Sequence, residues 1–247
     1  MEPRSCGRDT LMRREKMDEA WEQVLSVAAH LQRILPDAVL VGGTAAAIHA
    51  DHRFSHDDDH VVANLIPRFG EVLTELEAVA GWTTNRLKIP VMILGSFEGV
   101  ETGIRNLIRS APLQTEIRQT LYGPITLPTL DEMLRIKAYL VATRNATRDY
   151  LDTVALADRL EQERGVDGVW IALESLDRLY PQKNESSILL QVAKQMAEPI
   201  PKDLGAANLA EYRGIADRWK SWDAVLGCAS SLATLILKRI AKADESR

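Results

Sequence analysis

A short acidic segment, Ser55–His60, carries the residues most suited to binding a metal ion; it reads Ser-His-Asp-Asp-Asp-His. We expect it to run from a turn into a strand over 53–62. Because side chains alternate between the two faces of a strand, Asp57 and Asp59 would share one face and residues 56, 58 and 60 the other. Two neighbouring carboxylates repel each other unless a cation lies between them, and oxygen ligands of this kind suit Mg²⁺. The segment therefore predicts a Mg²⁺ site at Asp57 and Asp59; the alternative is a solvated acidic turn.

Upstream of the acidic segment lie Gly42, Gly43 and Thr44, between a predicted strand and a predicted helix. Two glycines let the backbone approach a ligand closely, and a helix N-terminus offers free N–H groups to a phosphate. Tight turns also use glycine for steric reasons alone. A Gly-Gly turn, one short helix and then the Asp-x-Asp strand would place phosphate donors and metal ligands at the same edge of a sheet.

A third candidate segment is basic and lies on predicted helix. On one continuous helix, about a quarter of the circumference would hold Lys137, Arg144, Arg148 and Asp152. If the helix is interrupted after Asn145, Thr147 would cap a second one. The functional interpretation is a basic wall that holds a triphosphate, with Asp152 or Asp149 orienting a cation. The alternative is a solvated face with an Arg148–Asp152 pair.

Histidines are concentrated in the same part of the chain, at His49, His52, His56 and His60. A metallohydrolase site built from His and Asp ligands is therefore an alternative hypothesis. No other segment supplies His or Cys at the spacing of metal ligands.

The elements that must position these residues alternate at first and then become helical. Apolar residues recur at spacings of three and four between Glu15 and Leu35, which predicts an amphipathic helix, and residues 1–14 are expected to form a loose arm. Further strands are expected over 38–41, 82–87, 90–94, 103–108 and 116–121, and further helices over 44–50, 67–80, 131–144, 148–164, 168–179, 185–197 and 222–241. The expected fold class is α+β, a mixed sheet with flanking helices followed by a helical region, with domains at 1–128 and 129–247.

Composition excludes several classes of protein. The 247 residues are 46% hydrophobic and carry 30 Lys+Arg against 35 Asp+Glu, a net charge of −5, which argues against a general nucleic-acid coat protein. Serines and a lysine interrupt the apolar stretch over 224–240, so no run approaches the roughly 18 residues of a membrane-spanning helix. Residues 1–16 are polar and lack the apolar core of a secretory signal. We therefore expect a cytoplasmic protein without a membrane partner.

Taken together, the motifs resemble a known family. The run Val41-Gly42-Gly43-Thr44-Ala45, followed by Arg53-x-Ser55-x-Asp57-x-Asp59, resembles the first motif of the DNA polymerase β nucleotidyltransferase superfamily. More narrowly, it is similar to the AbiEii/AbiGii toxin family, the enzyme half of certain bacterial toxin–antitoxin systems. That family continues with a helix bearing Lys and Arg and then Asp-x-x-Asp-Leu, which this chain matches at Lys137, Arg144 and Asp149–Thr153, with Thr in place of Leu. The matching segments span about 39–156.

The resemblance implies a polymerase-β-like nucleotidyltransferase domain and a helical domain that completes the active-site cleft. The catalytic residues that it implies are Asp57, Asp59, Lys137 and Asp152. The nucleotide-binding residues are Gly42, Gly43, Thr44, Ser55, Arg144 and Arg148. Asp57 and Asp59 would bind Mg²⁺, and Lys137 would neutralise the triphosphate of an NTP. The acceptor would be RNA, often a tRNA 3′ end, which Arg105, Arg109 and Arg118 would guide, and a cognate antitoxin would be a partner.

One departure from the superfamily pattern concerns the general base. A third carboxylate is common on the strand after Asp-x-Asp, but the expected strand over 91–97 has none; Glu98 and Glu101 lie just beyond it. A third carboxylate would take the proton from the attacking hydroxyl. Three alternatives remain: Glu98 or Glu101 reaches the site, the chemistry needs no third ligand, or the chain is a catalytically impaired nucleotide-binding regulatory module.

Overall fold

A computed structural model describes residues 6–183, 185–203, 209 and 212–245. These residues form an α+β fold, as the sequence indicated. They divide into two compact units that alternate along the chain. The first unit takes the chain up to Thr44, then Ser55–Leu107 and Ile117–Leu127. The second unit takes Ala45–Phe54, Ile108–Glu116 and the chain from Pro128 onward.

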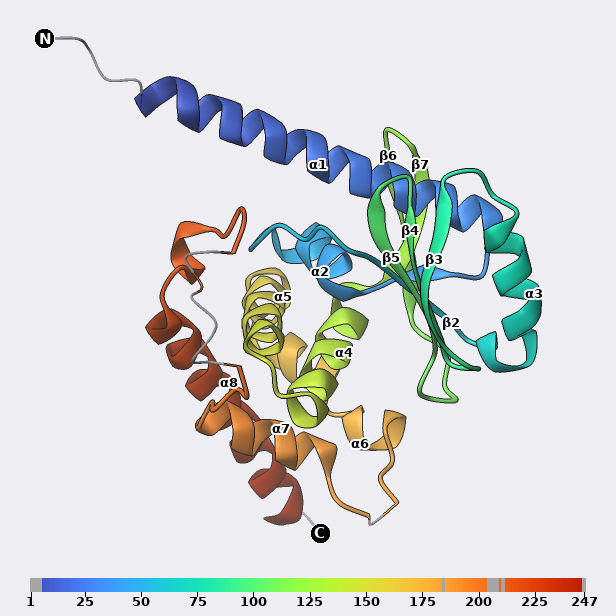
Figure 1. Ribbon diagram of the computed structural model, residues 1–247. Coiled ribbons are helices and arrows are strands. Elements are labelled where there is room, and N and C mark those ends of the chain that lie inside the picture. Colours follow the sequence, from blue (N-terminus) through green and yellow to red (C-terminus); the bar gives the residue numbers. More distant parts are fainter. Residues whose placement is uncertain (1–5, 184, 204–208, 210–211, 246–247) are drawn as a thin grey trace, which may run out of the picture. The chain divides into compact units, whose positions relative to one another are not determined.

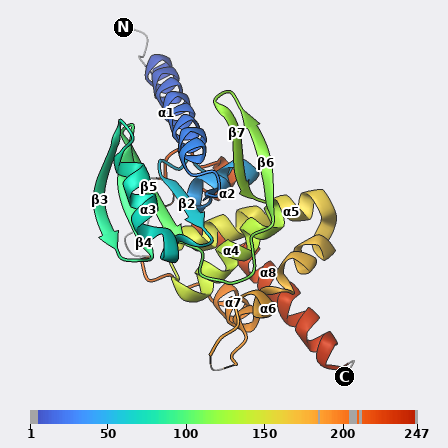
Figure 2. The same cartoon turned by 90° about the vertical axis from the view of Figure 1, so that its right-hand side faces the viewer.

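The first unit contains a mixed five-stranded sheet in the order β1-β2-β5-β4-β3, and β6 and β7 form a separate two-stranded ribbon (Figure 2). The strands are β1 (Val39–Leu40), β2 (Asp58–Val62), β3 (Trp82–Lys88), β4 (Met92–Phe97), β5 (Val100–Asn106), β6 (Thr115–Thr120) and β7 (Gly123–Pro128). β2 and β5 are parallel, whereas β1–β2, β3–β4 and β4–β5 are antiparallel. Parallel neighbours need a long connection, which α3, β3 and β4 supply here.

Two helices of the first unit, α1 (Cys6–Ile34) and α3 (Leu65–Glu77), share a hydrophobic core with the sheet (Figure 1). This core includes Val24, Val27 and Leu31 of α1, Leu65, Phe69, Val72 and Leu76 of α3, and Val62, Ile93, Phe97 and Ile104 of the strands. The expectation of a loose arm is wrong for residues 6–14, which belong to α1. Extending a formed helix fixes one residue for each hydrogen bond gained, whereas starting one is costly. Residues 1–5 of the expected arm lie outside the described residues.

The second unit is helical. Its helices are α4 (Leu130–Thr143), α5 (Thr147–Leu173), α6 (Leu176–Leu179), α7 (Ile188–Ala197), the short 3₁₀ helix Asp217–Trp219 and α8 (Trp222–Glu245). α4 packs on α5 and α7, and α8 packs on α5 and α7 (Figure 1). α2 (Gly42–Ala50) begins in the first unit and continues into the second. Inside α5, Gly165 has φ +70° and ψ −179°, a conformation that favours glycine, and it separates the two helices predicted on either side.

The basic segment is interrupted, as one of the two sequence hypotheses allowed. α4 ends at Thr143 and α5 begins at Thr147, with Asn145 at φ +58° between them. The cap differs from the prediction: Ala146 occupies the N-cap position, and the Asp149 carboxylate accepts from its N–H at 3.3 Å. The Thr147 hydroxyl instead donates to Asp203 at 2.8 Å.

α8 also departs from expectation. By length and composition, residues Trp222–Ala243 are apolar enough to cross a membrane, although serines and a lysine interrupt the apolar run. A buried core helix of a globular protein meets the same criterion. Val225, Ala229 and Ile236 are buried where α8 packs on α5 and α7, and 28% of the apolar stretch is buried within the structure.

Candidate functional site

The Asp59 carboxylate lies between two glycine backbones of the first unit. Gly103 faces Asp59 across the parallel β2–β5 pair, and a Cβ added there would lie 2.5 Å from Asp59 Oδ1. A Cβ added at Gly42 would lie 3.1 Å from Asp59 Oδ2, and Gly42 also has φ +74°, which disfavours other residues. Glycine at both positions therefore leaves the space that this carboxylate occupies.

The Gly-Gly turn is bonded directly to the Asp-x-Asp strand. The Val41 N–H donates to the Asp59 carbonyl at 2.7 Å, and the Thr44 hydroxyl donates to the Asp57 carbonyl at 2.6 Å. Thr44 is fully buried, so its hydroxyl is used within the fold. Gly43 follows Gly42 in the first turn of α2, where backbone N–H groups have no intrahelical partner. The turn is thus fixed against the strand that carries the predicted metal ligands.

The predicted alternation of faces is confirmed along β2. Asp59 is half-buried, with its side chain 30% exposed, whereas Asp58 and His60 are completely buried. Asp57 comes just before β2 and is half-buried like Asp59. Within β2 the acidic segment therefore has one accessible face and one face in the core, whereas His56, predicted on the face of Asp58 and His60, precedes the strand and is exposed.

On the core face, Asp58 Oδ1 lies 3.4 Å from His60 Nδ1, and His60 Nε2 lies 3.3 Å from Gln32 Nε2. Burial raises the pKa of Asp58 well above its usual range, and the charge of Asp59 adds to this effect. Burial lowers the pKa of His60 to about 3, so its imidazole is neutral near neutral pH. Both side chains belong to the packed interior of the first unit.

The positively charged side chain of Arg105 also lies on the accessible face. Arg105 Nε is 3.6 Å from Asp59 Oδ1, and Arg105 Nη1 is 2.8 Å from Met92 Sδ. Arg105 is paired with Val61 in the register of β2 and β5, one step diagonally from Asp59. Its side chain is 46% exposed, so this loose ion pair is open to solvent.

The strand beside the Asp-x-Asp strand is β5; the segment 91–97, considered above for the third carboxylate, supplies β4, which pairs with β5 and not with β2. The register pairs Asp58 with Thr102 and Asp59 with Gly103. By alternation, Glu101 of β5 lies on the same face as Gly103 and Asp59, and it is exposed.

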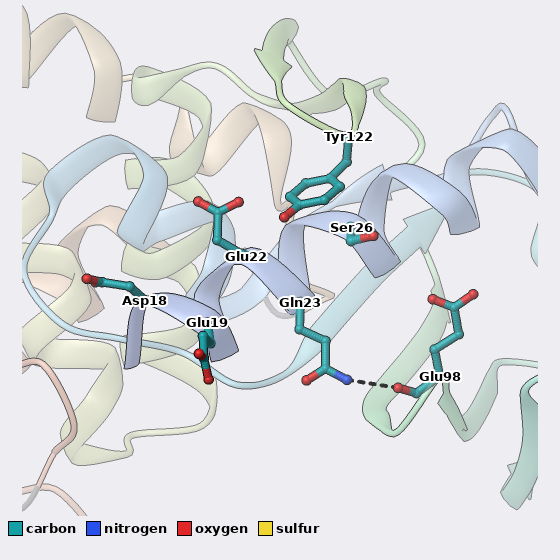
Figure 3. Close-up of a pocket in the computed structure, with 7 residues that line it drawn as sticks. All are labelled: Asp18, Glu19, Glu22, Gln23, Ser26, Glu98 and Tyr122. Carbon is teal, nitrogen blue, oxygen red and sulfur yellow. Dashed lines mark hydrogen bonds between the residues drawn. The ribbon is translucent and has the colours of Figure 1, made fainter. Parts of the chain in front are cut away.

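Glu98 is committed elsewhere. Its carboxylate bonds to His30 Nδ1 at 2.8 Å, and its carbonyl accepts from Gln23 Nε2 at 3.0 Å (Figure 3). Figure 3 shows it beside α1, at a hollow of about 690 Å³ that is lined by Asp18, Glu19, Glu22, Gln23, Ser26, Glu98 and Tyr122. Of the two candidate third carboxylates, Glu101 is therefore the one on the Asp59 face.

In the second unit, Asp152 is the centre of a buried ionic cluster. Its Oδ1 accepts from His52 Nε2 and Arg53 Nε, both at 2.7 Å. Its Oδ2 accepts from Arg53 Nη2 at 3.0 Å and lies 2.7 Å from Lys137 Nζ. An ionised carboxylate has about four lone-pair sites, so these contacts use them all.

Burial and charge oppose each other in this Asp152 cluster. Burial by itself would raise the pKa of Asp152, but Arg53 and Lys137 hold it well below its usual range. Burial lowers the pKa of Lys137, and the Asp152 charge opposes that shift. The pKa of His52 is likewise lowered by burial. The cluster thus joins the 52–53 segment to α4 and α5.

The other predicted residues of the basic segment lie apart from Asp152. Arg144 and Asp149 form an ion pair through Nη2 and Oδ1, and Arg148 is exposed at the start of α5. In the first unit, Ser55 is buried. The assignment of Lys137, Asp152, Arg144, Arg148 and Ser55 to nucleotide chemistry stays a prediction.

The four clustered histidines have separate environments. His49 Nε2 lies 2.8 Å from the Pro128 carbonyl, His52 bonds to Asp152, His60 is in the core of the first unit, and His56 is exposed. Among the described residues, no group of three or more His, Cys, Asp or Glu side chains is arranged to hold a metal ion. The described residues therefore contain no metal-binding cluster that would support the metallohydrolase alternative.

Several residues of these clusters escaped sequence reasoning. Arg53 belongs to the run that resembles the first superfamily motif but had no predicted role, and its position two residues before Ser55 was the available signal. His52 was predicted only as a candidate metal ligand, and Gly103 carried no local signal, because their partners lie far away in the sequence. Of the arginines expected to guide RNA, Arg109 is buried against Glu132 at 2.8 Å.

Comparisons with known proteins do not assign a family to the chain. No family model matches it. Over 232 residues, 87% of the chain, it is 27% identical to the heme uptake protein MmpL11 of Mycobacterium tuberculosis and to the probable transport protein MmpL11 of Mycobacterium bovis. It is 27% identical over 133 residues to the mycolic acid-containing lipids exporter MmpL11 of Mycolicibacterium smegmatis. The aligned parts are 22%, 22% and 13% of those proteins, so the chain spans about a fifth or less of their length.

Two solved structures have similar backbones. One is a candidate nucleotidyltransferase from H. pylori, with a TM-score of 0.48 and 17% identity, covering 92% of this chain and 95% of that one. The other is an antigenic nucleotidyltransferase-like protein from Paracoccidioides brasiliensis, with a TM-score of 0.43 and 15% identity, covering 65% and 88%.

Proposed function

We propose that the chain is a Mg²⁺-dependent nucleotidyltransferase that moves an NMP group from an NTP to an acceptor hydroxyl. The observation that supports it best is the placement of Asp59, half-exposed between the Gly42 and Gly103 backbones. The Gly-Gly turn that resembles the superfamily motif is hydrogen-bonded to this same strand. Phosphate-binding N–H groups and carboxylates are thereby held on one framework.

The donor set fits Mg²⁺. Asp57 and Asp59 offer carboxylate oxygens on the accessible side of the strand, and the glycines leave room around the Asp59 carboxylate. Mg²⁺ commonly takes only one or two protein carboxylates and completes its shell with waters and substrate phosphates. When bound, the ion would neutralise charge on the phosphate oxygens.

The reaction balances as a displacement at phosphorus. The acceptor hydroxyl oxygen forms a bond to the α-phosphorus, the bond from that phosphorus to the α–β bridging oxygen breaks, and pyrophosphate leaves with the electron pair. We assign the proton of the hydroxyl to Glu101, because it lies on the Asp59 face of β5 whereas Glu98 bonds to His30. N–H groups at the start of α2 would orient the phosphates.

The Asp152 cluster suits a positioning role. Its carboxylate is saturated by His52, Arg53 and Lys137. It anchors the chain at residues 52–53, a few residues before Asp57 in the sequence. If Lys137 bound the triphosphate, it would have to leave Asp152. The buried Asp152 carboxylate would then keep only His52 and Arg53 as partners.

The finer assignments rest on the resemblance to the AbiEii/AbiGii toxin family. It suggests RNA, often a tRNA 3′ end, as the acceptor and a toxin role with a cognate antitoxin. NTPs and tRNA occur in the cytoplasm, where we place the reaction.

Labelled NTPs test the reaction itself. Each of the four NTPs, labelled at the α- or the γ-phosphate, would be incubated with Mg²⁺, the protein and total bacterial tRNA or protein. We expect label in RNA from one α-labelled NTP and none from its γ-labelled form, and loss of that label in Asp57→Asn. Transfer of the γ-label would contradict nucleotidyl transfer, and so would equal labelling by Asp57→Asn.

A nucleotide-binding regulatory module is the second candidate function, favoured by the solvent exposure of Glu101, the one carboxylate proposed as base. Retained NTP binding with no transfer to any acceptor would support this candidate. A loss of turnover in Glu101→Gln with NTP binding unchanged would argue against it.

A further inference from the structure

The ion-pair partner of Asp59 comes from the neighbouring strand. Arg105 lies on β5, two residues beyond Gly103, so alternation places it on the Asp59 face. Diagonal neighbours on adjacent strands are within reach of a long side chain. Its Nε accordingly approaches Asp59 Oδ1 to 3.6 Å, too far for a hydrogen bond.

Three cations of the second unit already have a carboxylate partner within it. Lys137 is buried, with its Nζ 2.7 Å from Asp152, and Arg53 makes two hydrogen bonds to the same carboxylate. Arg144 is paired with Asp149. Arg105 differs because its ion pair is loose and its side chain is half-exposed. Its other contact within the described residues is to Met92 Sδ, which is a weak acceptor.

We propose that Arg105 is a phosphate-binding residue of this site, pairing with Asp59 while the site is empty and with the triphosphate of a bound NTP. The proposal rests on the proposed function. A guanidinium offers five N–H donors in a rigid fork that matches phosphate oxygens, and most of these donors are uncommitted to strong acceptors here. A cation entering beside Asp59 releases the guanidinium, and the phosphates that accompany the cation supply its new partner.

This exchange predicts opposite effects of one substitution on two ligands. Without a nucleotide, Arg105 competes with a divalent ion for Asp59, so removing it should strengthen metal binding. With a polyphosphate present, removing it should weaken binding, because a charge-assisted hydrogen bond is lost. A residue that merely supports the fold would change both affinities in the same direction.

The test measures Mn²⁺ affinity without nucleotide, by electron paramagnetic resonance of the free ion, and tripolyphosphate affinity at saturating Mg²⁺, by calorimetry. Arg105→Ala should bind Mn²⁺ about two- to fivefold tighter and tripolyphosphate about tenfold weaker. Arg105→Lys should fall between Arg105→Ala and the unchanged protein for tripolyphosphate. Arg86→Ala, which removes another exposed arginine of the first unit from β3, should change neither affinity.

Unchanged tripolyphosphate binding in Arg105→Ala would overturn the role of Arg105, and so would a shift of both affinities in one direction. Asp59→Asn separates this failure from failure of the proposed function. If Asp59→Asn weakens Mn²⁺ binding while Arg105→Ala does not affect tripolyphosphate, only the inference about Arg105 falls. If Mn²⁺ binding is the same in Asp59→Asn and the unchanged protein, the proposed metal site falls with it.

Discussion

Asp59 and Asp152, which the sequence motifs both predict as catalytic residues, have opposite environments. Asp59 in the first unit is 30% exposed and has one loose ion pair at 3.6 Å, whereas Asp152 in the second unit is 0% exposed and accepts from three side chains. A carboxylate with free lone pairs can take a metal ion, but one whose lone pairs are all used holds its neighbours in place. Residue type alone therefore does not distinguish a metal ligand from a residue that anchors its neighbours.

The largest expected effect is on stability, at Asp152. Asp152→Ala leaves Arg53 and Lys137 buried without their counter-charge, which typically costs about 3–5 kcal/mol. Urea unfolding should show this loss, while Asp59→Asn should change the unfolding free energy by less than about 1 kcal/mol. Equal stability losses in the two variants would break the distinction between anchor and ligand.

The next effect concerns Gly103. In Gly103→Ala the added Cβ would meet Asp59 Oδ1 at 2.5 Å, so the carboxylate must move. We expect Mn²⁺ affinity to fall about tenfold or more, with a stability cost of about 1–3 kcal/mol for the overpacking. Gly70→Ala is the matched control, because a Cβ there meets nothing within 4 Å. Unchanged Mn²⁺ binding in Gly103→Ala would show that the position of Asp59 does not matter.

The sequence predicted well the features of the Asp59 site that depend on neighbouring residues in the chain. Alternation along 57–60 correctly placed Asp59 on one face and Asp58 and His60 on the other, because a strand has a fixed period of two. It did not predict which of the two faces is buried. The turn at Gly42 followed from glycine between a strand and a helix. Both features depend on residues that are close in the sequence.

The neighbours of Asp59 and Asp152 depend on contacts between residues far apart in the sequence, and no local pattern of residues reveals such contacts. β5 lies beside β2 although β3 and β4 come between them in the chain, so Gly103 and Arg105 gave no signal of their nearness to Asp59. The His52–Asp152 contact joins residues 100 positions apart. β7 was missed altogether, because its six residues, Gly-Pro-Ile-Thr-Leu-Pro, look like a turn.

The smallest effect near neutral pH is the pH dependence of the core face. The pKa of His60 is about 3 when folded, below the usual value near 6.5, so below pH 6.5 the unfolded chain binds a proton that the folded chain does not. This contribution to stability is therefore present above pH 6.5 and is lost as the pH falls toward 3. Between pH 6.5 and 3, the unfolding free energy should decrease as the pH falls. The slope of this decrease should exceed the slope for His60→Gln by up to about 1.4 kcal/mol per pH unit. A pH slope that His60→Gln leaves unchanged would contradict the buried neutral imidazole.

The adjacent Asp58 and Asp59, on opposite faces of β2, allow a direct test of which face carries the chemistry. The rate of NMP transfer from the α-labelled NTP would be measured for Asp59→Asn and Asp58→Asn at equal concentrations of folded protein. We predict that Asp59→Asn abolishes transfer and that Asp58→Asn keeps it within about tenfold, because Asn resembles the protonated carboxyl that burial favours at Asp58. Transfer that survives in Asp59→Asn and is lost in Asp58→Asn would contradict the assignment of the chemistry to the accessible face.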